Sequence, residues 1–218
     1  MSNKFDLIIF DWDGTLSNSV GLITDLIIDS FNELGIKPPN RHSISLQFGI
    51  KLEHALLSLL PKKDVSKIDN LLDTYKTLFK KYSGQVNLFE GVEFGIKELK
   101  KQGYLLAIAT GGSRGGFNNA INQTSLDSFF NLTKTSNDCF SKPHPQMILE
   151  ILEELMVLPE KALMVGDSIH DLQMARSAGI SSLAILYGSQ TKKQLEGNDA
   201  LGYINDSYEL FEWIRING

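Results

Sequence analysis

Cysteine is almost absent from this chain, and its scarcity excludes two kinds of structure. The 218 residues include a single cysteine, Cys139, so the chain cannot form a disulfide bond within itself or build a cysteine-based zinc site. No apolar run approaches the length of a membrane span, so we expect no membrane partner. No signal-peptide pattern precedes the first apolar run, and the cytoplasm is therefore the expected compartment.

Positive charge is also scarce. Lysine and arginine total 21 against 26 aspartates and glutamates, which gives a formal net charge of −5. This balance argues against a general nucleic-acid-binding protein. The hydrophobic content of 42% and the chain length suffice for one large domain, or for one domain with an insertion.

The most informative local pattern lies over residues 5–16. A mostly apolar run ends there in Asp11, Asp13, Gly14 and Thr15. A short apolar run closed by turn residues is typical of a buried strand. Residues two apart point to the same side of an extended chain, so Asp11 and Asp13 face one small space, where two carboxylates need a cation. Taken alone, the motif also fits a strand followed by an ordinary acidic turn.

Strands and helices alternate along most of the remaining chain. We expect further buried strands at 105–109, 132–136, 162–165 and 182–186, with helices between them. This alternation predicts an α/β fold with a Rossmann-like, three-layer core around a parallel sheet and right-handed crossovers.

Residues 18–84 differ, because they carry helical patterns and no strand. Apolar residues recur at helical spacing before Gly35 and again over residues 46–60 and 64–82. We interpret this stretch as a small helical-bundle cap domain inserted into the core. The predicted domains are a discontinuous core of residues 1–17 and 85–218, and a cap of residues 18–84.

Polar side chains follow three of the predicted strands. Asp11 and Asp13 follow the first, Thr110 follows the strand at 105–109, and Asp167 and Asp171 follow the strand at 162–165. The carboxyl ends of parallel strands lie at one edge of the sheet, where such folds bind ligands. Scattered acidic residues would have no reason to follow strands, so the joint pattern outweighs any single motif.

Two aspartates and one loop suit phosphoryl transfer. A carboxylate such as that of Asp11 can attack phosphorus and carry the phosphoryl group. Asp13 can protonate the leaving oxygen and later deprotonate the attacking water. Thr110 and the backbone N–H groups of Gly111 and Gly112 precede a predicted helix, where unpaired donors and the helix dipole favour phosphate.

A lysine and two further aspartates complete the pattern. Lys142 places a compact cation where it can neutralise both phosphate and nucleophile, although a lysine by itself is usually a surface residue. Asp167 and Asp171 are four residues apart at a predicted helix start, hence on one face. Their hard oxygens suit Mg²⁺. Asp167 is also a candidate N-cap.

The motifs DxDGT, hydrophobic-Thr, Lys-Pro and GDxxxD occur in this order, and the set resembles the haloacid dehalogenase superfamily of aspartyl-phosphate phosphohydrolases over residues 6–186. The helical insertion is similar to the small mobile cap in that family's first insertion site, as in phosphoglycolate phosphatases and β-phosphoglucomutases. The resemblance implies Asp11 as nucleophile and Mg²⁺ ligand, and Asp13 as acid/base with its carbonyl on the metal. It implies Asp167 as a further Mg²⁺ ligand and Asp171 as support for that shell.

The resemblance also implies that Thr110 and Lys142 bind phosphate, together with the loop of Gly111 and Gly112. The chain departs from the family pattern in two places. Thr110 is followed by Gly-Gly where relatives often have Asn and a longer side chain, and Asn18-Ser19 stands where Asp-Ser is common. Neither departure removes a catalytic group, but both can alter substrate contacts.

Other reactive residues are weaker candidates. His144 and His170 are expected at exposed loop positions, and no pattern ties a base to Cys139 as a nucleophile. Arg114 follows the phosphate loop and either reaches substrate anions or starts a solvated helix. The cap positions at which we look for substrate specificity are Gln47, Lys51 and His54.

The leading hypothesis is a Mg²⁺-dependent phosphatase acting on a small phosphorylated metabolite, either phosphoglycolate-like or a sugar phosphate, with the cap closing over the substrate. One alternative is a β-phosphoglucomutase-like phosphosugar mutase. A non-enzymatic alternative is a phospho-accepting regulatory protein resembling response-regulator receivers, which are shorter and lack the helical insertion. The sequence leaves both a monomer and a homodimer open.

Overall fold

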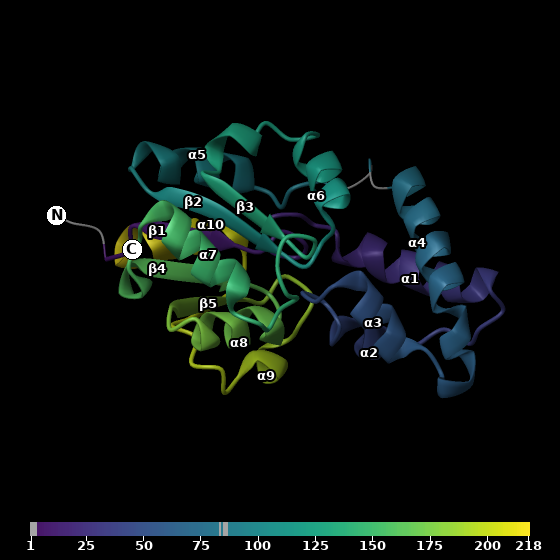
Figure 1. Ribbon diagram of the computed structural model, residues 1–218. Helices are drawn as coiled ribbons and strands as arrows, with labels where there is room; N and C mark the ends of the chain where they lie inside the picture. Colours follow the sequence, from purple (N-terminus) through teal and green to yellow (C-terminus); the bar gives the residue numbers. More distant parts are fainter. Residues whose placement is uncertain (1–3, 83, 85–86) are drawn as a thin grey trace.

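A parallel β-sheet forms the centre of the molecule (Figure 1). The computed structural model describes residues 4–82, 84 and 87–218. Within these residues the sheet has six strands in the order β3-β2-β1-β4-β5-β6. The strands are β1 (Leu7–Phe10), β2 (Leu105–Thr110), β3 (Leu132–Thr135), β4 (Ala162–Gly166), β5 (Ser181–Ile185) and β6 (Tyr203–Ile204). The predicted α/β fold is confirmed, and the short edge strand β6 was outside the prediction.

Helices cover both faces of the sheet, which gives the core its three layers (Figure 1). Ile8 and Phe10 of β1 are buried on one face with α5 (Val92–Lys101), α6 (Arg114–Ile121) and α10 (Ser207–Asn217). Leu7 and Ile9 alternate onto the other face. The helices there are α7 (Gln146–Leu155) and α8 (Ile169–Ser177), and the short α9 (Lys192–Leu195) follows β5. Each fully buried apolar side chain of this kind stabilises the fold by about 1.5–3 kcal/mol.

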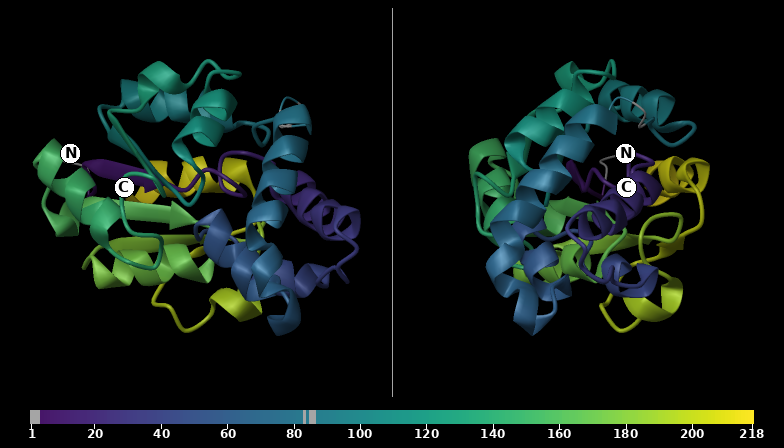
Figure 2. Two further views of the ribbon diagram at one scale, coloured as in Figure 1. Left: turned by 45° about the vertical axis from the view of Figure 1, so that its right-hand side comes forward. Right: turned by 90° about the vertical axis from the view of Figure 1, so that its right-hand side faces the viewer.

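A separate group of helices lies beyond one end of the sheet (Figures 1 and 2). It packs around its own apolar cluster, in which Phe31, Ile44, Leu56 and Leu71 are fully buried. The helices are α1 (Val20–Glu33), α2 (Arg41–Ser45), α3 (Leu52–Leu59) and α4 (Ile68–Tyr82), with a 3₁₀ turn at Lys62–Lys67. We call this group the cap helices.

The limits that the sequence predicts for the cap domain, 17/18 and 84/85, remain a prediction, and residue 85 lies outside the described residues. No helix in the described part of the chain is long and apolar enough to cross a membrane.

The predicted helix over residues 46–60 is wrong in its first half. Helix α2 ends at Ser45, and α3 begins only at Leu52. Gly49 between them has φ = +90°, a left-handed conformation that interrupts a helix and that residues other than glycine rarely adopt. The segment 46–51 is therefore a loop, which we call the cap loop. The apolar spacing that predicted a helix here continues across the loop and so did not reveal it.

Candidate active site

Three adjacent strands bring the predicted site residues together. Strand β1 pairs with β2 on one side and with β4 on the other. Asp11 directly follows β1, Thr110 is the last residue of β2, and Asp167 directly follows β4. The Asp11 N–H donates to the carbonyl of Val165 at 2.9 Å, which fixes the end of β1 against β4. Parallel pairing therefore explains why these positions, distant in sequence, share one edge of the sheet.

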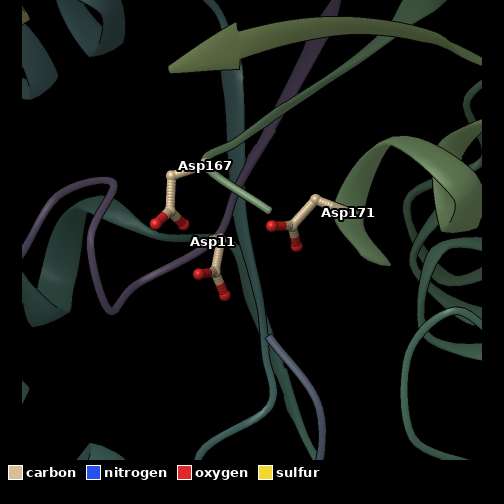
Figure 3. A group of neighbouring side chains, drawn as sticks. All are labelled: Asp11, Asp167 and Asp171. Atoms are coloured by element: carbon tan, nitrogen blue, oxygen red, sulfur yellow. The ribbon is translucent and has the colours of Figure 1, made fainter. Parts of the chain in front are cut away.

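Asp11, Asp167 and Asp171 form a buried carboxylate cluster. Each offers an oxygen within 4.8 Å of those of the other two. Figure 3 shows the three carboxylates pointing into a common space. The ammonium of Lys142 lies 2.6 Å from Asp11 Oδ1 and 2.5 Å from Asp171 Oδ1, and its side chain is fully buried. One lysine thus bridges two of the carboxylates.

Burial sets the charges of this cluster. It raises the pKa of Asp11 well above the usual range, against the pull of the Lys142 ammonium, and the charge of Asp171 raises it further. Burial and Asp171 likewise raise the pKa of Asp167, to about 7. Burial alone would lower the pKa of Lys142, but Asp11 and Asp171 outweigh it and hold it above the ordinary value. Three carboxylates around one cation leave room for a second positive charge.

Asp167 sits in a cradle formed by two glycines. A Cβ on Gly14 or on Gly188 would lie 2.3 Å from an atom of the Asp167 side chain. Thr15 Oγ1 donates to Asp167 Oδ1 at 3.3 Å, and the Ser189 N–H donates to Oδ2 at 2.6 Å. Gly14 also has φ = +87°, so the turn after β1 requires glycine twice over. The glycine of the opening motif therefore makes space for the carboxylate that follows β4.

The predicted helical relationship between Asp167 and Asp171 is wrong, because Asp167 lies outside helix α8 and is not its N-cap. Ser168 is the N-cap and forms a capping box with Asp171. The Ser168 hydroxyl donates to Asp171 Oδ2 at 2.6 Å, and the Ser168 N–H donates to the same oxygen at 3.1 Å. The spacing of Ser168 and Asp171 is the sequence signal that could have revealed this arrangement.

Asp13 is partly exposed and points toward the start of the cap helices. The Ser19 hydroxyl donates to Asp13 Oδ1 at 2.7 Å. Burial raises the pKa of Asp13, and the bond from Ser19 opposes that rise. Ser19 is the N-cap residue of α1, but its side chain makes no capping hydrogen bond to the helix. Sequence reasoning noted Ser19 as part of the Asn18-Ser19 departure and missed its contact with Asp13.

The Thr110 loop lies against the cap loop. The Gly112 N–H donates to Thr110 Oγ1 at 3.0 Å, which keeps the turn tight. A Cβ on Gly111 would lie 2.3 Å from the carbonyl oxygen of Gly49, so only glycine permits this approach. The Arg114 guanidinium turns away, because it donates to the Thr133 hydroxyl and carbonyl at 2.8 Å each and pairs with Asp138. The guanidinium is therefore not placed to contact substrate anions, and Arg114 instead starts helix α6, the other of its two predicted uses.

A cavity of about 90 Å³ lies between the carboxyl edge of the sheet and the cap helices. Its core end is formed by Asp11, Asp13 and the loop from Thr110 to Gly112. Its cap end is mostly apolar and consists of Ile23, Ile27, Ile44, Phe48, Ile50, Leu52, Ala55 and Tyr75, with Gln47 and Gly49. Sequence reasoning missed these apolar positions as site residues, because the same helical spacing also describes a helix packed into a hydrophobic core.

A family profile described as haloacid dehalogenase-like hydrolase matches residues 8–185. The chain belongs to this family. The pyrophosphatase PpaX of Bacillus mycoides is 31% identical over 218 residues, which cover 99% of this chain and 100% of that protein.

Two solved structures share the fold of this haloacid dehalogenase-like hydrolase. A putative haloacid dehalogenase-like hydrolase from Bacteroides fragilis superposes with a TM-score of 0.87 at 23% identity, over 95% of this chain and 100% of that one. A predicted phosphoglycolate phosphatase from Haemophilus somnus has a TM-score of 0.84 at 20% identity, over 97% and 99%.

Of the three cap positions considered for specificity, Gln47 alone lines the cavity of this hydrolase. The Lys51 side chain lies 3.4 Å from Glu53, and the Lys51 N–H donates to Ser141 Oγ at 2.8 Å. His54 is exposed. The cap loop therefore contributes to the cavity through Gln47 and through its apolar residues.

The remaining reactive residues lie outside the carboxylate cluster. His144 is exposed and lies against the Phe140 ring, as its loop position predicts. His170 is half-buried instead, and its Nε2 lies 3.1 Å from the carbonyl oxygen of Leu46 in the cap loop. Burial and the neighbouring Glu150 raise the pKa of the Cys139 thiol to about 12. A thiol with that pKa is a poor nucleophile at neutral pH.

Proposed function

We propose that this protein is a Mg²⁺-dependent phosphatase that hydrolyses a small phosphate monoester through an aspartyl-phosphate on Asp11. The observation that carries the proposal is the position of Asp11, buried at the end of β1 within 2.6 Å of the Lys142 ammonium and facing the Thr110 loop across one cavity. Membership of a hydrolase family supports it.

In the first step, a carboxylate oxygen of Asp11 attacks the phosphorus and the bond from phosphorus to the leaving oxygen breaks. The leaving oxygen takes a proton from Asp13, whose raised pKa suits a general acid. Lys142 and the N–H groups of the Thr110 loop stabilise the charge that develops on the phosphoryl oxygens. The step leaves an acyl phosphate on Asp11 and releases an alcohol.

In the second step, a water molecule attacks the same phosphorus, and the bond from phosphorus to Asp11 breaks. Asp13, now ionised, accepts the proton of that water. Inorganic phosphate leaves, and both aspartates return to their starting forms. The cap helices and cap loop, which cover the cavity, exclude bulk water during the first step.

The donor set fits a divalent cation, because three buried carboxylates face one lysine. Asp11, Asp167 and the carbonyl oxygen of Asp13 would hold Mg²⁺, with Asp171 supporting them through Lys142 and Ser168. When bound, Mg²⁺ supplies positive charge that offsets the repulsion between nucleophile and phosphate.

The substrate we propose is a small phosphorylated molecule. The relatives named pyrophosphatase PpaX suggest pyrophosphate. The resemblance to phosphoglycolate phosphatases suggests phosphoglycolate, and sugar phosphates also belong on the test panel. The proposal includes a cytoplasmic monomer or homodimer.

Phosphate release from p-nitrophenyl phosphate tests the proposal, with Mg²⁺ and with EDTA. We expect Asp11→Asn to abolish the Mg²⁺-dependent reaction. Asp6→Asn, on the exposed start of the same strand segment, is the matched control and should keep it. Borohydride reduction during turnover should convert the acyl phosphate at Asp11 into homoserine in the native protein alone.

Two results would replace the phosphatase proposal. Interconversion of sugar phosphate isomers without net phosphate release would indicate a mutase. A phosphorylated Asp11 that persists without turnover would indicate a regulatory phosphoprotein.

A further inference from the structure

We propose that the preferred substrate is the phosphate ester of a small, uncharged and largely apolar alcohol. Substrates whose leaving group carries an anionic group of its own are then poor substrates. This inference rests on the phosphatase function proposed above and names its substrate class. It follows from the side chains that line the two ends of the cavity.

At the cap end of the cavity, the side chains that would contact the leaving group are mainly hydrocarbon. Ile27, Ile44 and Phe48 are each less than 8% exposed and belong both to the apolar cluster of the cap and to the cavity wall. Because they pack the cap as well as line the cavity, these side chains cannot easily move aside for a hydrated group. The leaving group must therefore shed its water on binding.

No lysine, arginine or histidine lines the cavity in the part of the chain that the structure describes. Two of the nearby cations are held by buried or multiple partners, and the third, Lys51, does not line the cavity. Lys142 is held between Asp11 and Asp171, Lys51 lies beside Glu53, and Arg114 is bound to Thr133 and Asp138. A second anionic group in the cap end would have no cation to pair with.

The polar groups of the cap end are neutral. Gln47 carries an amide, and burial together with the nearby charge of Asp13 raises the pKa of Tyr75, so its phenol stays protonated. Within the described residues no hydrogen bond engages the Tyr75 hydroxyl. These groups can each serve a hydroxyl or ether oxygen, but neither neutralises a carboxylate or a phosphate.

A second anion would face two penalties in this cavity. It would lose its hydration against apolar side chains without gaining an ion pair, and it would approach the carboxylate of Asp11. Pyrophosphate and phosphoglycolate both carry such a group. The proposed substrate class therefore differs from the activity that the name of the PpaX relatives implies.

The decisive comparison uses isobutyl phosphate and phosphoglycolate, two esters of nearly the same shape that differ in the charge of the leaving group. We expect kcat/KM for isobutyl phosphate to exceed that for phosphoglycolate by about 100-fold, and pyrophosphate to be poorer than both. Equal values, or a preference for either anionic substrate, would overturn the inference. Isobutanol is also the poorer leaving group, so the expected preference cannot come from intrinsic reactivity.

A positive charge placed in the cap end should reduce the preference for isobutyl phosphate over phosphoglycolate. We expect Gln47→Lys to reduce the ratio of the two kcat/KM values at least about tenfold, because it supplies the missing cation. Gln47→Met, of similar length and uncharged, is the matched control and should retain the native ratio. An unchanged ratio in Gln47→Lys would count against the missing cation as the cause.

Failure of the inference can be told apart from failure of the phosphatase proposal. Native protein that hydrolyses p-nitrophenyl phosphate with Mg²⁺, and loses this activity in Asp11→Asn, but prefers phosphoglycolate or pyrophosphate overturns only the substrate class. Protein that releases phosphate from none of these compounds overturns the phosphatase proposal, and the inference falls with it.

Discussion

The two ends of the cavity are built from opposite kinds of side chain. At the core end, Asp11 and Thr110 are carried on adjacent strands, and hydrogen bonds and an ion pair fix their surroundings. At the cap end, Ile44 and Phe48 are held by packing alone and have no polar partner. The core end thus suits the phosphoryl transfer proposed above, whereas the cap end suits selection of the proposed alcohol.

The two ends of the cavity also differ in what they contribute to the stability of the fold. The core end keeps several buried charges together, an arrangement that gains little stability and is costly when one partner is removed. The cap end gains stability from the same apolar contacts that shape the cavity. Substitutions at the core end should therefore affect every substrate, while those at the cap end should affect substrates unequally.

The largest effect is expected from Lys142→Met, which removes the buried cation at the core end. Activity toward every ester should fall by about 10³-fold, because the phosphoryl charge loses its fixed partner. The free energy of unfolding at pH 7, measured by urea denaturation, should fall by about 3–5 kcal/mol, because Asp11 and Asp171 are left unpaired.

Lys134→Met is the control for this substitution. Lys134 also bridges two carboxylates, those of Glu150 and Glu154, but these lie closer to the surface. Its removal should cost about 1 kcal/mol or less and leave activity intact. Equal losses in the two variants would contradict the distinction between a cation buried with its partners and one whose partners are partly exposed.

The free energy of unfolding, measured as a function of pH, tests whether the neighbouring carboxylates and burial raise the pKa of Asp167 at the core end. The pKa of Asp167 is about 7 in the fold against 3.8 for an ordinary aspartate, so the folded protein binds a proton more tightly than the unfolded chain. In EDTA, stability should therefore fall as the pH rises from about 4 to 7, by roughly 2–4 kcal/mol.

Mg²⁺ should reverse this trend, because the cation favours ionised carboxylates. Asp167→Asn should make the fall measured in EDTA smaller, leaving the part that Asp11 contributes, whereas Asp6→Asn should leave the fall as it is. An equal fall in the native protein and in Asp167→Asn would show that Asp167 is not destabilised by its surroundings.

The core end was largely predictable from the sequence, because its information is local. Asp11 and Asp167 directly follow strands and Thr110 is the last residue of one, and each of these strand ends is marked by a change from apolar to polar residues. Parallel pairing then brings the ends together whatever lies between them. What escaped prediction at this end were individual bonds, such as that from Lys142 to Asp171, because side-chain geometry leaves no pattern in the sequence.

The cap end was less predictable for a physical reason. A residue such as Ile44 or Phe48 follows the same spacing whether it faces a neighbouring helix or a cavity, and here it faces both. The cap loop was missed because its apolar residues continue the helical pattern while Gly49 breaks the backbone. A single glycine in a helical pattern is tolerated often enough that it does not reveal a loop.

Gly49→Ala probes the contact between the two ends. An added Cβ would lie 2.4 Å from Ser168 Oγ, so the cap loop must shift from the core. We expect KM to rise about tenfold with a smaller change in kcat, and the free energy of unfolding to fall by about 1–2 kcal/mol.

Gly35→Ala separates backbone strain from contact. Gly35 also has positive φ, +63°, but a Cβ there would meet nothing within 4 Å. This variant should lose about 1 kcal/mol of stability and keep the native KM. If both alanines raised KM alike, strain in the cap rather than its contact with Ser168 would be responsible.

The smallest effect is expected from Ser19→Ala, which removes the 2.7 Å hydrogen bond to Asp13 where the core meets the cap. That bond lowers the pKa of Asp13 against the effect of burial, so its loss should raise the pKa further. If Asp13 donates the proton to the leaving group, the alkaline limb of the kcat profile should move to higher pH. Ser30→Ala, which removes a hydroxyl bonded to the Leu26 carbonyl within α1, should leave the profile in place. A downward shift in Ser19→Ala would mean that the hydroxyl serves the protonated carboxyl instead, and that the acid of the first step is tuned by the core alone.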